Sequence, residues 1–413
     1  MKYTVVTFGC RVNQADSLAI ERQMRAAGAT AAPAAEADVV VVNTCSVTAS
    51  ADQGARQAIR RIARDNPSAR IVVTGCYATR RPDEVRELPN VAVVVANADK
   101  DDFSFATTAD RFGGGDGPCG ESLMPGAAGR TALTVRVQTG CEERCSYCII
   151  PSTRGRSRSK ELSHVVREMR SAAAAGYREI VVTGVHLGSY GRDLGDGTTL
   201  TALVRTLAEW PDDVLFRISS LEPMDCADEI VELAAASPRL APHFHLPLQH
   251  GSDRMLRAMQ RPYTADFYER LVHRIHAVLP DASIGSDVIV GFPGETDQDF
   301  EQMSALLERL PLSHLHVFPY SDRPGTAASP MPGKIDGTTI RGRGRRVRDI
   351  GERLRRRFRD TQVGRSVRAL TVDDGWSVVT ENYLKLGIDA QCARNEWVDV
   401  AVLSHQQGHL LRG

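Results

Sequence analysis

The chain has 413 residues, of which 42% are hydrophobic, 25% charged and 6% aromatic, and 51 basic residues balance 51 acidic ones. This composition excludes a disordered, collagen-like or disulfide-stapled chain, and the zero net charge argues against an indiscriminate polycation. The length predicts two or three domains with sizeable cores.

The amino-terminal residues 1–10 indicate a strand that ends in a cysteine, and they lack the basic head and apolar stretch of a signal peptide. No uninterrupted apolar run approaches the roughly 18 residues of a membrane helix. We therefore expect a cytoplasmic protein that does not associate with a membrane. Because thiols stay reduced in the cytosol, the nine cysteines suggest metal ligation or catalysis rather than disulfides.

The first hundred residues alternate between strand and helix patterns, which predicts βαβ units and an open parallel sheet. The predicted strands cover residues 3–8, 37–42 and 70–74, with helices at 17–27 and 53–64.

Three cysteines follow these strands directly, namely Cys10, Cys45 and Cys76. The carboxyl ends of parallel strands share one edge of the sheet, which is where such sheets bind ligands. A single cysteine at such a position is commonly an inert core residue. Three at equivalent positions favour a shared metal site.

A glycine-rich stretch at residues 113–129 predicts a linker, in which Cys119 is interpreted as incidental. Beyond it a second alternating series begins, with helical patterns such as 163–175 and 267–278 between strands. Six βα units predict a partial barrel whose site lies at the strand carboxyl ends. The predicted strands are residues 133–138, 179–183, 214–219, 243–248, 283–290 and 314–318.

The residues after 340 form two segments of different composition. Residues 341–359 contain ten arginines against Asp349 and Glu352, which favours either RNA phosphate binding or a solvated helix face. Short strand patterns then follow at 366–372, 376–381 and 397–403, which predict a small β-barrel.

The segment with the most specific chemistry is a CxxxCxxC motif made by Cys141, Cys145 and Cys148, directly after the first strand of the second domain. Structural zinc sites usually close with four ligands in two separated pairs, whereas here three thiols share one loop. Three cysteines on a [4Fe-4S] cluster leave one iron free for a small molecule, so the motif favours such a cluster over zinc.

This motif at the start of a partial barrel resembles the radical S-adenosylmethionine superfamily. The resemblance implies that the free iron chelates S-adenosylmethionine and that electron transfer releases a 5′-deoxyadenosyl radical. With the three amino-terminal cysteines, the arginine-rich segment and the small β-barrel, nearly the whole chain resembles the methylthiotransferases. The resemblance implies a second [4Fe-4S] cluster on Cys10, Cys45 and Cys76, and a carboxyl-terminal TRAM-like RNA-binding domain.

We therefore expect an α/β protein of three parts. They are an open parallel methylthiotransferase domain at 1–110, a partial (β/α)6 radical S-adenosylmethionine core at 127–357, and a TRAM-like β-barrel at 360–413. The resemblance assigns catalysis to Cys141, Cys145 and Cys148. It further implies S-adenosylmethionine contacts for a set of residues near predicted strand ends, although capping or loop hydrogen bonding is the alternative for Glu222, Gln249 and Asp287. The set is Tyr147, Thr183, Gly184, Glu222, Gln249, Asp287 and Gly291.

The opening residues 8–17 and the stretch 154–159 resemble the branch that modifies N6-threonylcarbamoyladenosine in tRNA. The alternatives are the isopentenyladenosine tRNA branch, the ribosomal-protein aspartate branch, and a non-enzymatic RNA-binding iron-sulfur redox sensor. The expected partners are a tRNA anticodon stem-loop and a low-potential donor such as flavodoxin or ferredoxin. A monomer is expected.

Overall fold

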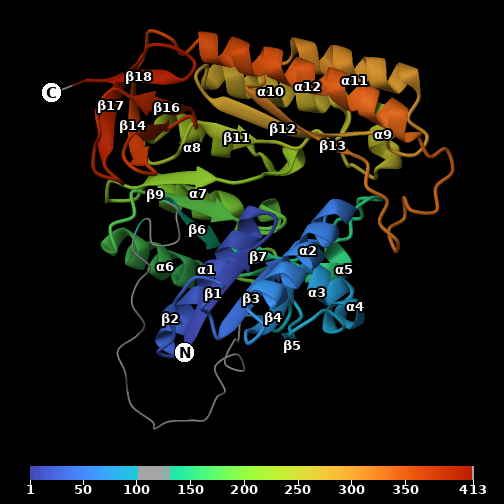
Figure 1. Cartoon of the computed structure of the whole chain (residues 1–413). Helices are drawn as coiled ribbons and strands as arrows, with labels where there is room; N and C mark the ends of the chain where they lie inside the picture. The colour runs from blue at the N-terminus through green and yellow to red at the C-terminus, as the bar shows by residue number, and fades with distance from the viewer. Residues whose placement is uncertain (101–124, 126–130, 412–413) are drawn as a thin grey trace.

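The structure is a computed structural model that describes residues 1–100, 125 and 131–411 (Figure 1). Most of the predicted linker, including Cys119, lies outside the described residues. The observed strands match the predicted series closely. No described helix is long and apolar enough to span a membrane.

The amino-terminal domain is a five-stranded parallel sheet in the order β2-β1-β3-β4-β5. Its centre is apolar on both faces, because β3 consists largely of buried valines. Helix α1 covers one face, and α2, α3 and α4 cover the other. The elements are β1 Lys2–Thr7, α1 Arg11–Ala26, β2 Thr30–Ala31, β3 Val39–Thr44, α2 Ala49–Asp65, β4 Arg70–Gly75, α3 Cys76–Arg80, α4 Pro82–Arg86 and β5 Val91–Val94.

The central domain contains six parallel barrel strands in the order β6-β9-β10 and β11-β12-β13. Isolated bridges, such as the one between Ser220 and His245, join β10 to β11 and complete the partial barrel. The strands are β6 Leu133–Arg136, β9 Glu179–Thr183, β10 Leu215–Ile218, β11 His243–His245, β12 Ser283–Val290 and β13 His314–Pro319. A small ribbon of β7 Gln138–Thr139 and β8 Arg158–Ser159 precedes the second unit.

Helices pack around the outside of these strands and enclose the largest core of the molecule. The α-helices are α5 Ile150–Arg154, α6 Leu162–Ala174, α7 Leu200–Ala208, α8 Asp228–Ala236, α9 Asp253–Ala258, α10 Ala265–Val278, α11 Asp297–Arg309 and α12 Gly337–Asp360. Two 3-10 turns, Leu187–Ser189 and Pro223–Asp225, follow β9 and β10.

The carboxyl-terminal domain is a closed five-stranded barrel in the order β14-β15-β16-β18-β17. Its strands are β14 Ser366–Val372, β15 Ser377–Thr380, β16 Lys385–Ile388, β17 Trp397–Val402 and β18 Gln407–Leu410. It contacts the amino ends of the central strands, where Asn382 donates to the Asp281 carbonyl at 2.9 Å. Figure 1 shows it on a different side of the central domain from the amino-terminal sheet.

A buried ionic cluster joins the amino-terminal and central domains. Asp16 on α1 pairs with Lys100, with Arg136 on β6 at 2.8 Å, and with Arg154 on α5 at 3.1 Å. Burial disfavours the Asp16 carboxylate, but the three cations outweigh burial and hold the pKa of Asp16 below its ordinary value. The cluster therefore fixes the first sheet against the barrel.

Candidate active site

The first set of thiols lies at the carboxyl ends of three neighbouring strands. Cys10 follows β1, Cys45 follows β3, and Cys76 begins α3 after β4. Gly9 has a φ of 94°, and a Cβ placed there would lie 2.8 Å from the Cys45 sulfur. Glycine is thus needed at this position for the chain to pass so close to Cys45.

Buried polar groups surround these thiols. The Asn97 amide donates to the Cys76 sulfur at 3.7 Å and to the Thr153 carbonyl at 2.9 Å. The pKa of Cys45 is raised to about 11, chiefly by burial and to a smaller extent by the neighbouring Cys10 and Cys76. A protonated thiol would be favoured here unless a cation held the sulfur, so the pocket is suited to metal-bound thiolates.

The second set lies in the loop after β7. Cys141, Cys145 and Cys148 are close enough for each to disfavour the thiolate of the next. Burial is the largest effect, and it raises the pKa of Cys148 to about 12. Gly140, with a φ of 78°, begins the loop, and a Cβ there would lie 1.8 Å from the Arg156 carbonyl oxygen. The loop therefore turns tightly under the strand ends.

Two residues beside this loop were missed by sequence reasoning as site residues. Arg261 follows α9, is buried, and donates to the Cys145 sulfur at 3.2 Å while it pairs with Glu222. His186 lies beside Cys141 and contacts Asp225 at 2.7 Å. Burial opposes the His186 imidazolium, but Asp225 and Cys141 raise its pKa to about 10. His186 lies two residues after Gly184, which the sequence did point to, whereas no sequence signal marks Arg261.

The residues predicted to contact S-adenosylmethionine divide into two groups. Those at strand ends are Thr183, the last residue of β9, Gly184 directly after it, Glu222 after β10, Gln249 after β11 and Gly291 after β12. Tyr147 lies within the second cysteine loop, and it packs on the cluster that contains Phe292.

Asp287 differs from this group, because it lies within β12 and accepts from His245 and His316 at 3.0 and 3.1 Å. All seven assignments remain predictions, and Asp287 has a well-defined local partner set.

A loop after β13 links the two sets of cysteines. Arg323 donates to the Ser46 hydroxyl at 2.8 Å, next to Cys45, and pairs with Asp52 at 2.6 Å. Farther along, the amide of Ala328 donates to the Ser146 carbonyl at 2.7 Å, within the CxxxCxxC loop. The two sets of thiols therefore border a common region of the molecule.

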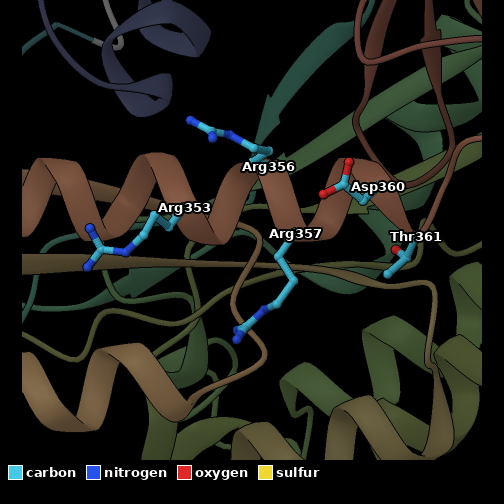
Figure 2. A pocket seen from close by; sticks show the side chains of 5 residues that line it. All are labelled: Arg353, Arg356, Arg357, Asp360 and Thr361. Atoms are coloured by element: carbon cyan, nitrogen blue, oxygen red, sulfur yellow. The ribbon is translucent and has the colours of Figure 1, made fainter.

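The arginine-rich helix α12 is only partly available to a ligand. Arg343, Arg346 and Arg353 pair with carboxylates on or before α11. Figure 2 shows that Arg356 and Arg357 leave opposite sides of the helix near a surface hollow of about 450 Å³. The Arg357 side chain donates to the Leu310 carbonyl, so it too secures the helix.

Sequence comparisons decide the family. A model described as the radical SAM superfamily matches residues 135–307, and one described as uncharacterized protein family UPF0004 matches residues 2–96. The threonylcarbamoyladenosine tRNA methylthiotransferase MtaB of Aquifex aeolicus is 35% identical over 94% of this chain and 96% of its own. The chain belongs to the radical S-adenosylmethionine methylthiotransferases. It is therefore an enzyme that transfers a sulfur-containing group, and its cofactors are S-adenosylmethionine and two [4Fe-4S] clusters.

Other methylthiotransferases match over similar lengths. The MtaB protein of Rickettsia prowazekii is 32% identical over 99% of this chain and 97% of its own. The tRNA-2-methylthio-N(6)-dimethylallyladenosine synthase of Thermobifida fusca is 32% identical over 90% of this chain and 78% of its own.

A solved structure shares the fold. The radical S-adenosylmethionine methyltransferase TsrM of Kitasatospora setae, bound to tryptophan and a cofactor analogue, has a TM-score of 0.54 at 18% identity. The match covers 77% of this chain and 72% of the TsrM chain. At this identity the likeness concerns the fold alone.

The two sets of thiols fit the cofactors of this methylthiotransferase. Each set supplies three sulfurs, which is the donor set of a [4Fe-4S] cluster with one open iron. The Arg261 and Asn97 groups that donate to sulfur would offset the negative charge of thiolate-bound clusters.

Proposed function

We propose that the protein converts N6-threonylcarbamoyladenosine, next to the anticodon of tRNA, into its 2-methylthio derivative. The observation that carries this is the similarity to MtaB proteins over 94% and 99% of the chain. The opening residues 8–17 and the stretch 154–159 support the same branch. The dimethylallyladenosine synthase of Thermobifida fusca aligns over 78% of its own length, and it supports that branch less well.

We further propose that Cys141, Cys145 and Cys148 hold the [4Fe-4S] cluster that generates the radical. The second [4Fe-4S] cluster is held by Cys10, Cys45 and Cys76. When bound, the cofactors supply a radical able to remove hydrogen from adenine C2 and the methylated sulfur that replaces it. The protein's own contribution is position and shielding. Gly9 and Gly140 allow the loops to approach, and the buried surroundings of Cys45 and Cys148 exclude water.

Arg261 organises the proposed cofactor site. Its guanidinium joins the Cys145 sulfur to the Glu222 carboxylate, so a ligand of the cluster and a predicted cofactor contact share one rigid cation. A planar guanidinium with fixed donors suits such a bridge better than a flexible ammonium. Arg261 therefore acts as a positioning residue.

The carboxyl-terminal barrel, residues 360–413, is proposed to be a TRAM-like domain that binds the anticodon stem-loop. The other two proposed domains are the methylthiotransferase domain at 1–110 and the radical S-adenosylmethionine core at 127–357. A small β-barrel beside arginines suits splayed loop bases and phosphates. We also propose a cytoplasmic monomer that receives electrons from a flavodoxin or ferredoxin.

The test is anaerobic turnover of reconstituted protein with dithionite, S-adenosylmethionine and stem-loops that do or do not carry threonylcarbamoyl. We expect the 2-methylthio nucleoside only from the modified stem-loop. If product formed only on isopentenyladenosine RNA, or only on a ribosomal protein, the enzyme would belong to one of the other branches. A protein that formed no 5′-deoxyadenosine under any condition would fit the redox-sensor alternative.

A further inference from the structure

A series of aromatic rings crosses the inner face of the barrel, in addition to the groups already assigned. Successive ring centroids lie 5.0 to 6.5 Å apart, within the range of favourable ring contacts. The series comes from β11, β13 and the turn before β16, and we call it the ring track. Its members are Tyr383, His243, His314, His245, His316 and Phe318.

The ring track faces away from the helical core. Alternate residues of a strand point to opposite faces, and Ile284, Val288 and Val290 of β12 pack in the core. Gly285 and Asp287 therefore face the rings. A Cβ at Gly285 would lie 2.1 Å from the His314 ring, so the missing side chain leaves room for the track.

Both ends of the track are open to a ligand. Tyr383 is 43% exposed and Phe318 is 40% exposed, which is unusual for large aromatic side chains. Tyr383 also has a φ of 73°, a costly conformation for a bulky residue. Its hydroxyl accepts from Arg11 at 2.6 Å, and Arg11 directly follows Cys10. One end of the track thus contacts the residue that follows the first of these cysteines.

The other end of the track leads toward the second set. Tyr320, two residues beyond Phe318, bonds through its amide to the Val290 carbonyl, and its ring packs edge-on against Phe292. The same apolar cluster contains Tyr147 of the CxxxCxxC loop. A planar base lying on the track would therefore lie between the two proposed clusters.

His316 provides a charged position on this track. The Asp287 carboxylate is held ionised, since its two imidazole partners outweigh burial and lower its pKa, so it can only accept hydrogen bonds. His316 therefore donates through Nδ1, and no described residue hydrogen-bonds to its Nε2. The bond to Asp287 raises the pKa of His316, and 57% of its side chain is exposed. A second N–H is thus available to an anion.

We propose that the ring track binds the target nucleoside, with its base against the rings and the carboxylate of its N6 substituent on His316. This rests on the proposed function, which supplies a substrate whose threonyl group is anionic. Stacking is a sequence-tolerant way to hold a splayed base, and the imidazolium adds a charge-assisted hydrogen bond. His316 is then the residue that selects a carboxylate-bearing adenosine over a neutral one.

The same groups could also suit a metal ion, because ligand atoms of His245, Asp287 and His316 lie within 4.8 Å of one another. We favour the nucleoside, since both imidazoles already share one Asp287 oxygen and the exposed rings continue beyond these three residues. Metal analysis enters the test as an opposing outcome.

The test compares two anticodon stem-loops, one with threonylcarbamoyladenosine and one with its methyl ester, which removes the negative charge. Reconstituted wild-type enzyme should show a KM for the ester roughly 10- to 100-fold above that for the acid. His316→Phe keeps a ring but removes the donor, and should lose this difference by weakening acid binding. His316→Gln keeps a polar side chain but removes the positive charge, and it should also lose most of this difference. The iron content per chain should stay unchanged in both variants, because no cysteine is altered.

His273→Phe is the matched control, because His273 is an exposed imidazole that faces Glu269 on the outer helix α10. It should keep the wild-type ratio. A normal acid-to-ester ratio in both His316 variants would overturn the proposal, and so would loss of a bound metal other than cluster iron on substitution. If wild-type enzyme formed no product on either RNA, the proposed function itself would fail, which is a distinct result.

Discussion

At the radical-cluster loop, three thiols in eight residues make a direct test possible. Replacing Cys141, Cys145 and Cys148 together by alanine should halve the iron content from about eight atoms per chain, because each set of three cysteines implies one [4Fe-4S] cluster. It should also abolish 5′-deoxyadenosine formation, as measured by chromatography. Cofactor cleavage that survived the triple change would contradict the assignment of these thiols.

The amino-terminal set should behave differently. Alanine at Cys10, Cys45 and Cys76 should again remove about half of the iron, yet leave cofactor cleavage largely intact, because the radical loop lies in another domain. Methylthio product should disappear. Replacing Cys226, which is buried in the central core and belongs to neither set, by serine is a control that should keep both activities. Full methylthiolation by the triple variant would make the amino-terminal cysteines structural.

Asp16 is the residue on which the contact between two domains depends. Asp16→Asn would remove the buried carboxylate that Lys100, Arg136 and Arg154 share, and it should cost about 3–5 kcal/mol of unfolding free energy. Because the folded pKa of Asp16 is lowered, its contribution is present above its ordinary pKa and is lost as the pH falls through the folded pKa. The destabilisation should therefore be equal at pH 7 and pH 5.5 in urea unfolding.

The control for this prediction is Asp65→Asn, which removes an exposed pair with Arg64. Such a pair contributes about 0–1 kcal/mol. An Asp16 variant that unfolded at the same urea concentration as the Asp65 variant would show that the buried cluster does not hold the domains together.

At the level of elements, the arginines of α12 form two groups, one paired with carboxylates of the protein and one exposed. Arg345, Arg348 and Arg356 are exposed, and no ion pair or hydrogen bond joins their side chains to another described residue. Changing these three to glutamate should weaken stem-loop binding. It should also reduce the slope of log affinity against log salt by roughly 0.7 to 0.9 for each phosphate that the helix no longer neutralises. Filter binding across salt concentrations measures both.

Arg346→Glu and Arg353→Glu together form the contrasting variant, since these arginines pair with Glu301 and Glu308. This variant should unfold at a lower urea concentration than the wild type, and its salt slope should stay close to that of the wild type. If the salt slope changed only in the paired-arginine variant, the phosphates would be bound by the opposite set of arginines, and the prediction would be wrong.

The sequence predicted the central elements because their patterns are long and regular. The strands 283–290 and 179–183 were predicted at the bounds that the structure gives, and the predicted alternation places all six barrel strands. The short strands β2, β5, β7, β8, β16 and β18 were not predicted as strands of their own, because they have two to four residues and depend on neighbours for pairing. The backbone hydrogen bonds of these short strands depend on how the surrounding elements pack.

The predicted thiol sets are likewise brought together, since strand order alone places cysteines at one sheet edge. Contacts between distant residues could not be predicted in this way. Arg261 meets Cys145 across 116 positions, and Arg11 meets Tyr383 across 372. Such pairs leave no local pattern, because they depend on how whole domains pack.

At the scale of the whole molecule, three domains meet around one region. The amino-terminal sheet contributes Cys10 and Arg11, the central barrel contributes the ring track, and the carboxyl-terminal barrel contributes Tyr383. The buried Arg217 holds the last junction, where it donates to the Glu381 carbonyl at 2.9 Å and lies over the Tyr383 ring. The arrangement suits a reaction in which one base must meet two cofactor centres.

The most direct test of the central claim is a product count from anaerobic turnover on threonylcarbamoyl-bearing and unmodified stem-loops side by side. The account predicts 2-methylthio nucleoside from the modified RNA alone. It also predicts S-adenosylhomocysteine and 5′-deoxyadenosine in about equal amounts, because one cofactor molecule methylates sulfur and another generates the radical. Equal methylthio product on RNA without threonylcarbamoyl, or product only on a ribosomal protein, would contradict it.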